Sequence, residues 1–179
     1  MSIPEIEILK ILREWNKVEV ILLKDIDRVE TATSRLEYAK AGDKIKVPLW
    51  MAKKLIDKGI ATIDVEKMIS WIHRVHWREK VQKTTEFGIS KLPREFYTNA
   101  ELLLYTLKNK PEIFHEISDD LKKSLLDKLK EIVNKRIAII PLLSDIEDTE
   151  LIDRLTDEEK VLLNLYKAII SSWRKFIEV

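Results

Sequence analysis

The sequence predicts an α+β protein, predominantly α, in which a small N-terminal β-rich domain is followed by a larger helical bundle domain. Short β-branched segments gather in the first third of the chain, and helical periodicity with end caps runs through the rest. The composition agrees, because 45% hydrophobic and 35% charged residues with only 3 Gly are typical of a folded, helix-rich chain. We therefore expect two domains, residues 1–62 and residues 63–179.

Residues 18–23 and 44–47 predict two strands of a small sheet, since both segments are short, β-branched and partly alternating. The run Ala41-Gly42-Asp43 predicts a turn before the second of them. A third, brief strand is expected at residues 61–63. The N-terminal domain should thus contain a small sheet.

A short helix is expected between the second and third strands. Pro48 stands where a helix begins, apolar residues follow at helical spacing, and Gly59 stands where a C-terminal cap belongs. We expect this helix to lie across the sheet.

Capping residues divide the helical part into four predicted helices. Asp64 caps a helix over residues 65–82, and Ser118 with two following acids caps a helix over residues 119–140. Capping boxes start the other two, with Thr98 and Glu101 before residues 99–108, and Thr156 and Glu159 before residues 157–176.

The last predicted helix has one wide apolar face, which we expect to be buried. The residues of this face are Leu162, Leu165, Tyr166, Ile169, Ile170, Trp173, Phe176 and Ile177.

The helix over residues 65–82 is apolar on two sides. One stripe contains Val65, Met68, Trp71, Ile72 and Val75, and Trp77 projects from the opposite side. Such a helix needs neighbours on both sides. It is either central in its own bundle, or Trp77 meets another subunit.

Two charged segments have open interpretations. Residues 65–94 hold seven bases and three acids, interleaved with Trp71, Trp77 and Phe87. They form either a solvated helix face or a surface for nucleic acid. Residues 145–159 hold eight acids against one base, Arg154, and form either a solvated loop and helix start or a docking surface for a basic partner.

The residues that carry chemistry are sparse. Cysteine is absent, the three glycines are too far apart for a phosphate loop, and no serine has the glycine-flanked turn of a nucleophile. His73 and His76 share a spacing that metal sites use, but no third ligand accompanies them. We expect no enzyme, no metal and no cofactor. With acids at Glu5 and Glu7 and no long apolar run, we expect a cytoplasmic protein without a membrane segment.

Two segments resemble a known family. Residues 47–52, V-P-L-W-M-A, resemble the V-P-L-W-L-A run that closes the small domain of GINS subunits in which that domain comes first. Residues 87–97 are similar to the family signature F-x-x-L-P-x-x-[FY], with one extra residue between Phe87 and Leu92-Pro93. An apolar helix follows, and the helix from Leu121 ends in basic residues at Arg136, as in the family.

The resemblance implies a non-catalytic subunit of the archaeal GINS complex, a scaffold and accessory factor of the MCM replicative helicase in DNA replication. It implies a sister GINS subunit in a two-plus-two heterotetramer, contact with MCM and with a RecJ-like or Cdc45-type protein, and, in some archaea, with primase. It also implies a replisome-associated location and at most weak contact with DNA.

An assembly subunit should present apolar residues on more than one helix face. The residues that we expect at protein interfaces are Trp71, Trp77, Phe96, Tyr97, Trp173 and Phe176. The residues that we expect to be structural parts of the two family motifs are Pro48, Leu49, Trp50, Leu92 and Pro93. The alternative is a winged-helix-like DNA-binding protein, whose short helix would present Lys53, Lys54 and Lys58 to phosphates.

Overall fold

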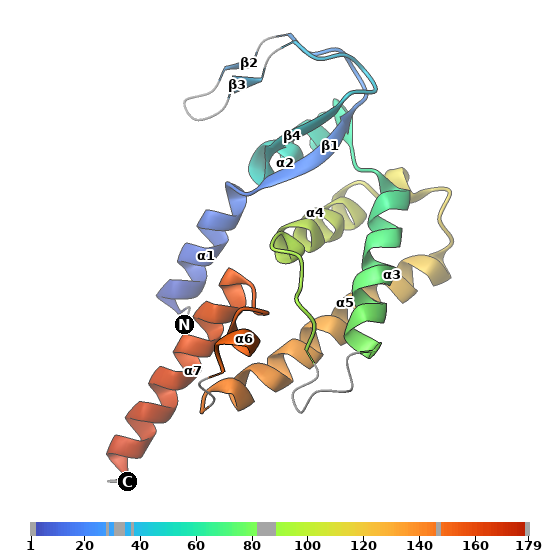
Figure 1. The fold of residues 1–179 in the computed structure, drawn as a ribbon. Coiled ribbons are helices and arrows are strands. Elements are labelled where there is room, and N and C mark those ends of the chain that lie inside the picture. The colour runs from blue at the N-terminus through green and yellow to red at the C-terminus, as the bar shows by residue number, and fades with distance from the viewer. Residues whose placement is uncertain are drawn as a thin grey trace. The chain divides into compact units, whose positions relative to one another are not determined.

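The computed structural model describes residues 3–27, 29–30, 35–36, 38–81, 89–145 and 148–177 (Figure 1). Helices make up 67% of the structure, and the β part is small. The predicted fold class is therefore confirmed. None of the described helices is long and apolar enough to span a membrane. The parts of the predictions that fall on Ser34, Gln82, Lys83, Phe87, Gly88 and Glu147 lie outside the described residues.

Contacts divide the chain into two compact units that alternate along the sequence. Unit 1 comprises Met1–Ser70 and Glu95–Lys122, and unit 2 comprises Trp71–Arg94 and Lys123–Val179. The division falls within two helices, α3 (Val65–Val81) and α5 (Asp119–Ile139). The predicted domains, 1–62 and 63–179, divide the chain by its sequence pattern and stay a prediction.

Unit 1 contains a three-stranded antiparallel sheet. β1 (Lys17–Leu22) lies between β4 (Lys44–Pro48) and β5 (Ala61–Thr62). Alternate residues of β1 are buried, namely Val18, Val20 and Leu22, as expected for a strand with one face on the core. All three predicted strands are confirmed. A further two-stranded pair, β2 (Val29–Glu30) with β3 (Arg35–Leu36), lies beyond the ends of β1 and β4 and was not predicted (Figure 1).

The turn before β4 is also confirmed. Gly42 has φ +92, in the region that favours glycine. The Lys40 amide donates to Asp43 Oδ2 at 2.8 Å, and the Ala41 amide donates to Asp25 Oδ1 at 2.8 Å. These bonds occupy the backbone donors of the turn.

The predicted short helix is α2 (Leu49–Asp57), which packs against β1, β4 and β5 of the sheet (Figure 1). Pro48 occupies its N-cap with φ −55, and Gly59, with φ +62, follows its C-cap. Both helix-end predictions are thus confirmed. The helix buries Leu49, Met51, Ala52 and Ile56.

Helix α4 (Phe96–Asn109) packs against α2 and begins three residues earlier than predicted. The predicted capping box of Thr98 and Glu101 is wrong. Thr98 lies inside the helix, wholly buried, and its Oγ1 accepts a hydrogen bond from Asn16 Nδ2 at 3.0 Å. Glu101 pairs with Lys53 and Arg13. The burial of Phe96 in the first turn explains the earlier start, because that side chain is in the core only if the helix includes it.

The remaining predicted helix starts are confirmed. The Lys67 amide donates to Asp64 Oδ1 at 3.0 Å before α3, and the Leu121 amide donates to Ser118 Oγ at 3.3 Å before α5. Two 3₁₀ segments, Pro111–Phe114 and Ile140–Leu143, and a short helix, α6 (Thr149–Ile152), were not predicted. Helix α7 (Asp157–Phe176) has the predicted bounds and capping box.

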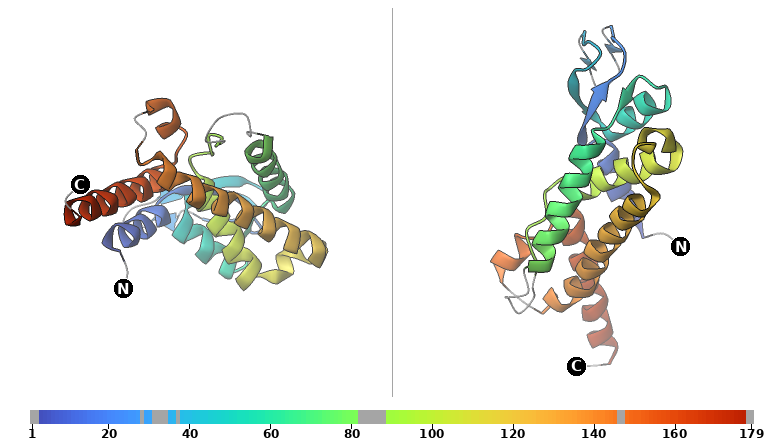
Figure 2. Two further views of the ribbon diagram at one scale, coloured as in Figure 1. Left: turned by 90° about the horizontal axis from the view of Figure 1, so that it is seen from below. Right: turned by 90° about the vertical axis from the view of Figure 1, so that its right-hand side faces the viewer.

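One hydrophobic cluster of unit 2 lies around the start of α7. It contains Ile89, Ile140, Leu143, Leu155 and Leu163. The prediction of one buried face holds in part near the start of α7, where Leu162 and Tyr166 pack against this cluster, and is wrong over the C-terminal half. Only Glu159 and Leu163 are buried, and both lie in the first two turns. The C-terminal half of α7 extends past the other helices of unit 2 (Figure 2), and its apolar residues Ile169, Trp173 and Phe176 are exposed.

Candidate protein interface

The start of α7 is held by a buried ion pair. Arg136, from α5, is wholly buried and donates two hydrogen bonds to Glu159, from Nε to Oε1 and from Nη2 to Oε2, both at 2.8 Å. Glu159 is also the acid of the capping box, because its Oε2 accepts from the Thr156 amide at 2.9 Å. One carboxylate therefore both caps α7 and neutralises Arg136. This two-pronged geometry is the strong form of an Arg–carboxylate contact.

A second buried acid completes this cluster. Glu79, on α3, lies 3.4 Å from Arg136 and 3.5 Å from Lys135, and accepts hydrogen bonds from the amide and hydroxyl of Ser90. Arg136 Nη1 also donates to the Ser90 carbonyl at 2.8 Å. Arg136 thus contacts both carboxylates, and Lys135 contacts Glu79. The cluster joins α3, α5 and α7 within unit 2 and is structural.

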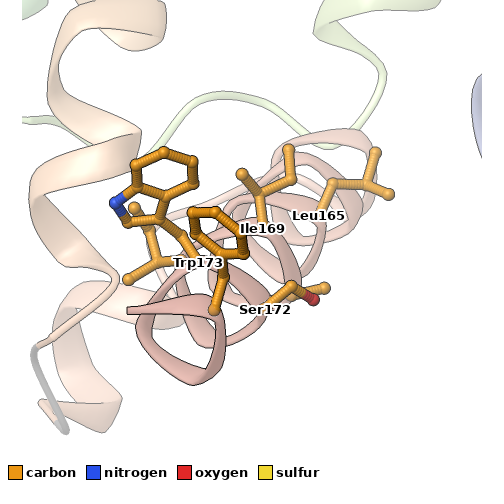
Figure 3. A pocket seen from close by; sticks show the side chains of 7 residues that line it. Leu165, Ile169, Ser172 and Trp173 are labelled. Carbon is orange, nitrogen blue, oxygen red and sulfur yellow. The ribbon is translucent and has the colours of Figure 1, made fainter. Parts of the chain in front are cut away.

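An apolar stripe occupies the C-terminal half of α7, and we call it the α7 stripe. Leu165, Ile169, Trp173 and Phe176 follow one another at helical spacing, and Ile169, Trp173 and Phe176 are 60%, 59% and 74% exposed. Figure 3 shows Leu165, Ile169 and Trp173 along one side of the helix. The rings of Trp173 and Phe176 pack together with centroids 5.3 Å apart. These side chains line an open groove of about 740 Å³.

The side of α7 away from the stripe is basic. By helical spacing, Lys167, Arg174 and Lys175 lie there, and α7 has no acid after Glu159. Arg174 pairs with Asp145 at 3.1 Å, an exposed contact that contributes little stability. The helix is thus apolar along the stripe and basic on the opposite side.

Exposure of the α7 stripe is costly for a free chain. Burying a side chain of this size stabilises by roughly 1.5–3 kcal/mol relative to leaving it in water. A single exposed leucine would need no explanation, but a contiguous apolar patch marks an interaction site. The α7 stripe can therefore bind another apolar helix face.

Unit 1 has a second exposed apolar surface that the sequence reading did not identify. Helix α1 (Pro4–Glu14) buries none of its residues. Ile8, Ile11, Leu12 and Trp15 share one side at helical spacing and are 54%, 62%, 57% and 48% exposed. The spacing of these four residues is the signal that could have predicted both the helix and its open face.

The predicted interface residues fall into three groups. Trp173 and Phe176 lie in the α7 stripe. Trp77 is 66% exposed on α3, away from the residues that α3 buries. Phe96 is wholly buried in unit 1 with its ring 5.1 Å from that of Tyr97, so it offers no surface to a partner as it stands. Trp71 and Tyr97 are half-buried.

The predicted motif residues lie at structural positions. Leu49 and Leu92 are buried, and Trp50 is half-buried with its ring edge-on to Trp15, the centroids 6.2 Å apart. Pro48 caps α2, and half-buried Pro93 lies in the segment before α4.

The Arg136 cluster was not predicted from the sequence. Its signal is a charged residue where helical periodicity calls for an apolar one. On α5, Leu125, Leu129 and Ile132 are buried and Arg136 continues the same side. Glu79 continues the buried side of α3 in the same way.

His73 and His76 do not come together as a metal pair. His76 Nε2 lies 2.6 Å from Glu131 Oε2, while His73 is exposed. Burial, then the charges of Lys128 and His76, lower the pKa of His73. Across the part of the chain that the structure describes, no group of three or more His, Asp or Glu side chains could hold a metal.

The lysines of α2 have mixed surroundings. Lys53 is largely buried and bridges Glu14 at 2.5 Å and Glu101 at 2.6 Å. Burial acts to lower the pKa of Lys53, but its hydrogen bonds to these two acids outweigh that effect and raise it. Lys54 lies over the ring of Trp50 at 5.4 Å.

Comparison with known proteins adds no relative. No protein-family model matches the chain, and no curated protein is significantly similar to it.

Proposed function

We propose that this chain is a non-catalytic assembly subunit of the GINS type, and that it binds its sister subunit through the α7 stripe. The observation that carries the proposal is the exposure of Ile169, Trp173 and Phe176 on one side of a well-capped helix. The resemblance of residues 47–52 and 87–97 to the GINS motifs names the family.

A sister subunit is the partner that the α7 stripe fits. Its centre is aromatic and aliphatic, and buried aromatic anchors contribute most of the binding energy at protein interfaces. The first turn of the helix that carries it is fixed by the capping box and by Arg136.

The wider partners belong to the same proposal. By the GINS resemblance, a two-plus-two heterotetramer with the sister subunit would contact the MCM helicase and a RecJ-like or Cdc45-type protein, with primase as a further contact. The exposed side of α1 provides a second surface for such contacts. The location would be the replisome.

The winged-helix alternative is less well supported. It needs the lysines of α2 free to meet phosphates, and Lys53 is largely buried between two glutamates. Lys54 is occupied at the face of Trp50. Only Lys58 of the three has no such contact among the described residues.

The test is recovery of a partner on the tagged full chain from extract of its source cells at moderate salt, followed by mass spectrometry. We expect a GINS sister subunit in near-equal amount, with MCM or a RecJ-like protein behind it. The double variant Trp173→Ala/Phe176→Ala should lose the sister subunit and keep its helical circular dichroism.

The matched control is Trp77→Ala, which removes an equally exposed tryptophan from another helix and should keep the sister subunit. Recovery of nuclease-sensitive material without a sister subunit, or equal recovery on the wild-type chain and the double variant, would contradict the proposal.

A further inference from the structure

The outer face of α3 within unit 2 is the strongest surface that the proposed function leaves unused. Trp77 is 66% exposed at its centre. Residues three and four positions away share its side of the helix, and these are His73, Arg74, Lys80 and Val81, all exposed. Together with Arg78 they make up what we call the Trp77 face.

The Trp77 face is positively charged. Arg74, Arg78 and Lys80 have no ion-pair partner among the residues that the structure describes. Glu79, the one acid of this stretch, points inward and is 2% exposed. Glu131 lies at the border of the face, where His76 holds it at 2.6 Å. A further base, Lys128, lies nearby. Burial is the larger cause of the lowered pKa of His73, and the charge of Lys128 is the next.

The Trp77 face differs from the α7 stripe in what surrounds its aromatic ring. On α7, Trp173 continues a row of apolar side chains that a partner helix can cover. On α3, Trp77 is a single large ring among cations, with Val81 its one exposed apolar neighbour. A ring with nearby phosphate-binding groups is the combination that single-stranded nucleic acids need.

We infer that the Trp77 face binds single-stranded nucleic acid, with Trp77 stacked on one base and Arg74, Arg78 and Lys80 on the flanking phosphates. Arg74 and Lys80 lie six residues apart, about 9 Å along the helix axis, so they reach phosphates on either side of the stacked base. A duplex is a poorer ligand, because its bases already stack on one another. The inference does not depend on the proposed sister subunit.

The test is fluorescence anisotropy of a labelled single-stranded oligothymidylate titrated with the purified full chain at physiological salt. Wild type should bind with a dissociation constant between roughly 1 and 100 µM, the range of non-specific binding. Trp77→Ala should weaken binding by roughly 5- to 150-fold. Trp77→Phe, which keeps a ring, should recover most of the affinity.

The charge readout is separate. Arg74→Ala/Arg78→Ala should make binding less steep in salt, by about 1.4 in the slope of log affinity against log salt for two phosphate contacts on a single strand. Lys167→Ala/Lys175→Ala removes two bases from α7, and Trp173→Ala removes an exposed tryptophan there. Both controls should bind as wild type does.

The outcomes that overturn the inference are distinct from those that concern the sister subunit. The inference fails if the oligothymidylate shows no anisotropy change, if Trp77→Ala binds it as tightly as wild type, or if the chain prefers duplex DNA. It also fails if Trp77→Ala loses the sister subunit. The last result would assign the Trp77 face to a protein partner. Circular dichroism melting of each variant shows whether lost binding reflects lost folding. If Trp77→Ala is less stable, the affinity of Trp77→Phe decides whether the aromatic ring is needed for binding.

Discussion

Arg136 connects three helices of unit 2 from a wholly buried position. Its guanidinium contacts two carboxylates and two carbonyls, those of Ser90 and Arg154. A buried cation of this kind is tolerated because its partners replace the water that it has lost. Removing Arg136 would leave Glu79 and Glu159 buried with less opposing charge.

Arg136→Ala is therefore expected to lower the free energy of unfolding by roughly 3–5 kcal/mol, the range for breaking a buried pair. The measurement is urea denaturation followed by circular dichroism. Arg174→Ala is the control, because the same change at the exposed pair with Asp145 should cost about 0–1 kcal/mol. Similar losses in both variants would show that burial does not set the cost.

Tyr105 provides a pH-dependent test in unit 1. Its hydroxyl donates to Asp57 Oδ2 at 2.6 Å. That hydrogen bond, with burial and the charge of Asp57, raises the pKa of Tyr105 from 10.0 to about 12. The folded pKa is the higher one, so the stability from this bond is fully present below pH 10. It is lost as the pH rises through 12.

Asp57→Asn should return the pKa of Tyr105 towards about 10, the value of a free tyrosine. Near-ultraviolet absorbance of tyrosinate during a pH titration measures this change. Tyr105→Phe should remove the late step altogether, which assigns it. An unchanged titration curve in Asp57→Asn would refute the role of this hydrogen bond.

At the scale of elements, the residues that mark helix ends gave the most reliable predictions. The capping box of Thr156 and Glu159 places α7 correctly because it rests on local backbone bonds. The apparent box at Thr98 fails because the burial of Phe96 moves the start of α4 into the preceding loop. Tertiary packing, which cannot be seen in a single sequence, determined which of the two capping boxes formed.

Thr156→Ala tests the box that did form. It should destabilise unit 2 by about 1 kcal/mol, within the usual range of roughly 0.5–2 kcal/mol for a lost N-cap. Thermal melting by circular dichroism measures the effect. Thr149→Ala, an exposed threonine in the first turn of α6, should change the melting temperature much less. A larger loss in Thr149→Ala would argue against the capping account.

For the whole molecule, periodicity predicted which helix sides are apolar but not which are covered. The α7 stripe has the pattern of a buried face, and its spacing is the same whether the cover comes from this chain or from another one. The same limit applies to Trp77. The GINS motifs were needed to propose a partner, because composition and spacing describe only the surface that a partner would meet.

The α7 stripe should also make the isolated chain self-associate at high concentration. Ile169→Glu/Phe176→Glu should remain folded and stay monomeric at concentrations where wild type forms larger species, as measured by light scattering after sizing. Asn164→Glu/Ser171→Glu adds the same charge at exposed polar positions of α7 and should behave as wild type. If both variants disperse the chain equally, charge and not apolar contact governs association.

The Glu159 carboxylate, shared between the cap and Arg136, also implies a gradient of local opening along α7. Amide protons next to the Thr156 cap should exchange with deuterium slowly, since the helix opens there only when the buried ion pair breaks. Towards Phe176 each further turn has less packing to hold it, so exchange should accelerate residue by residue. Binding of a sister subunit would then appear as slow amide exchange that extends to the C-terminal turns of α7. This measurement needs no substitution of a side chain.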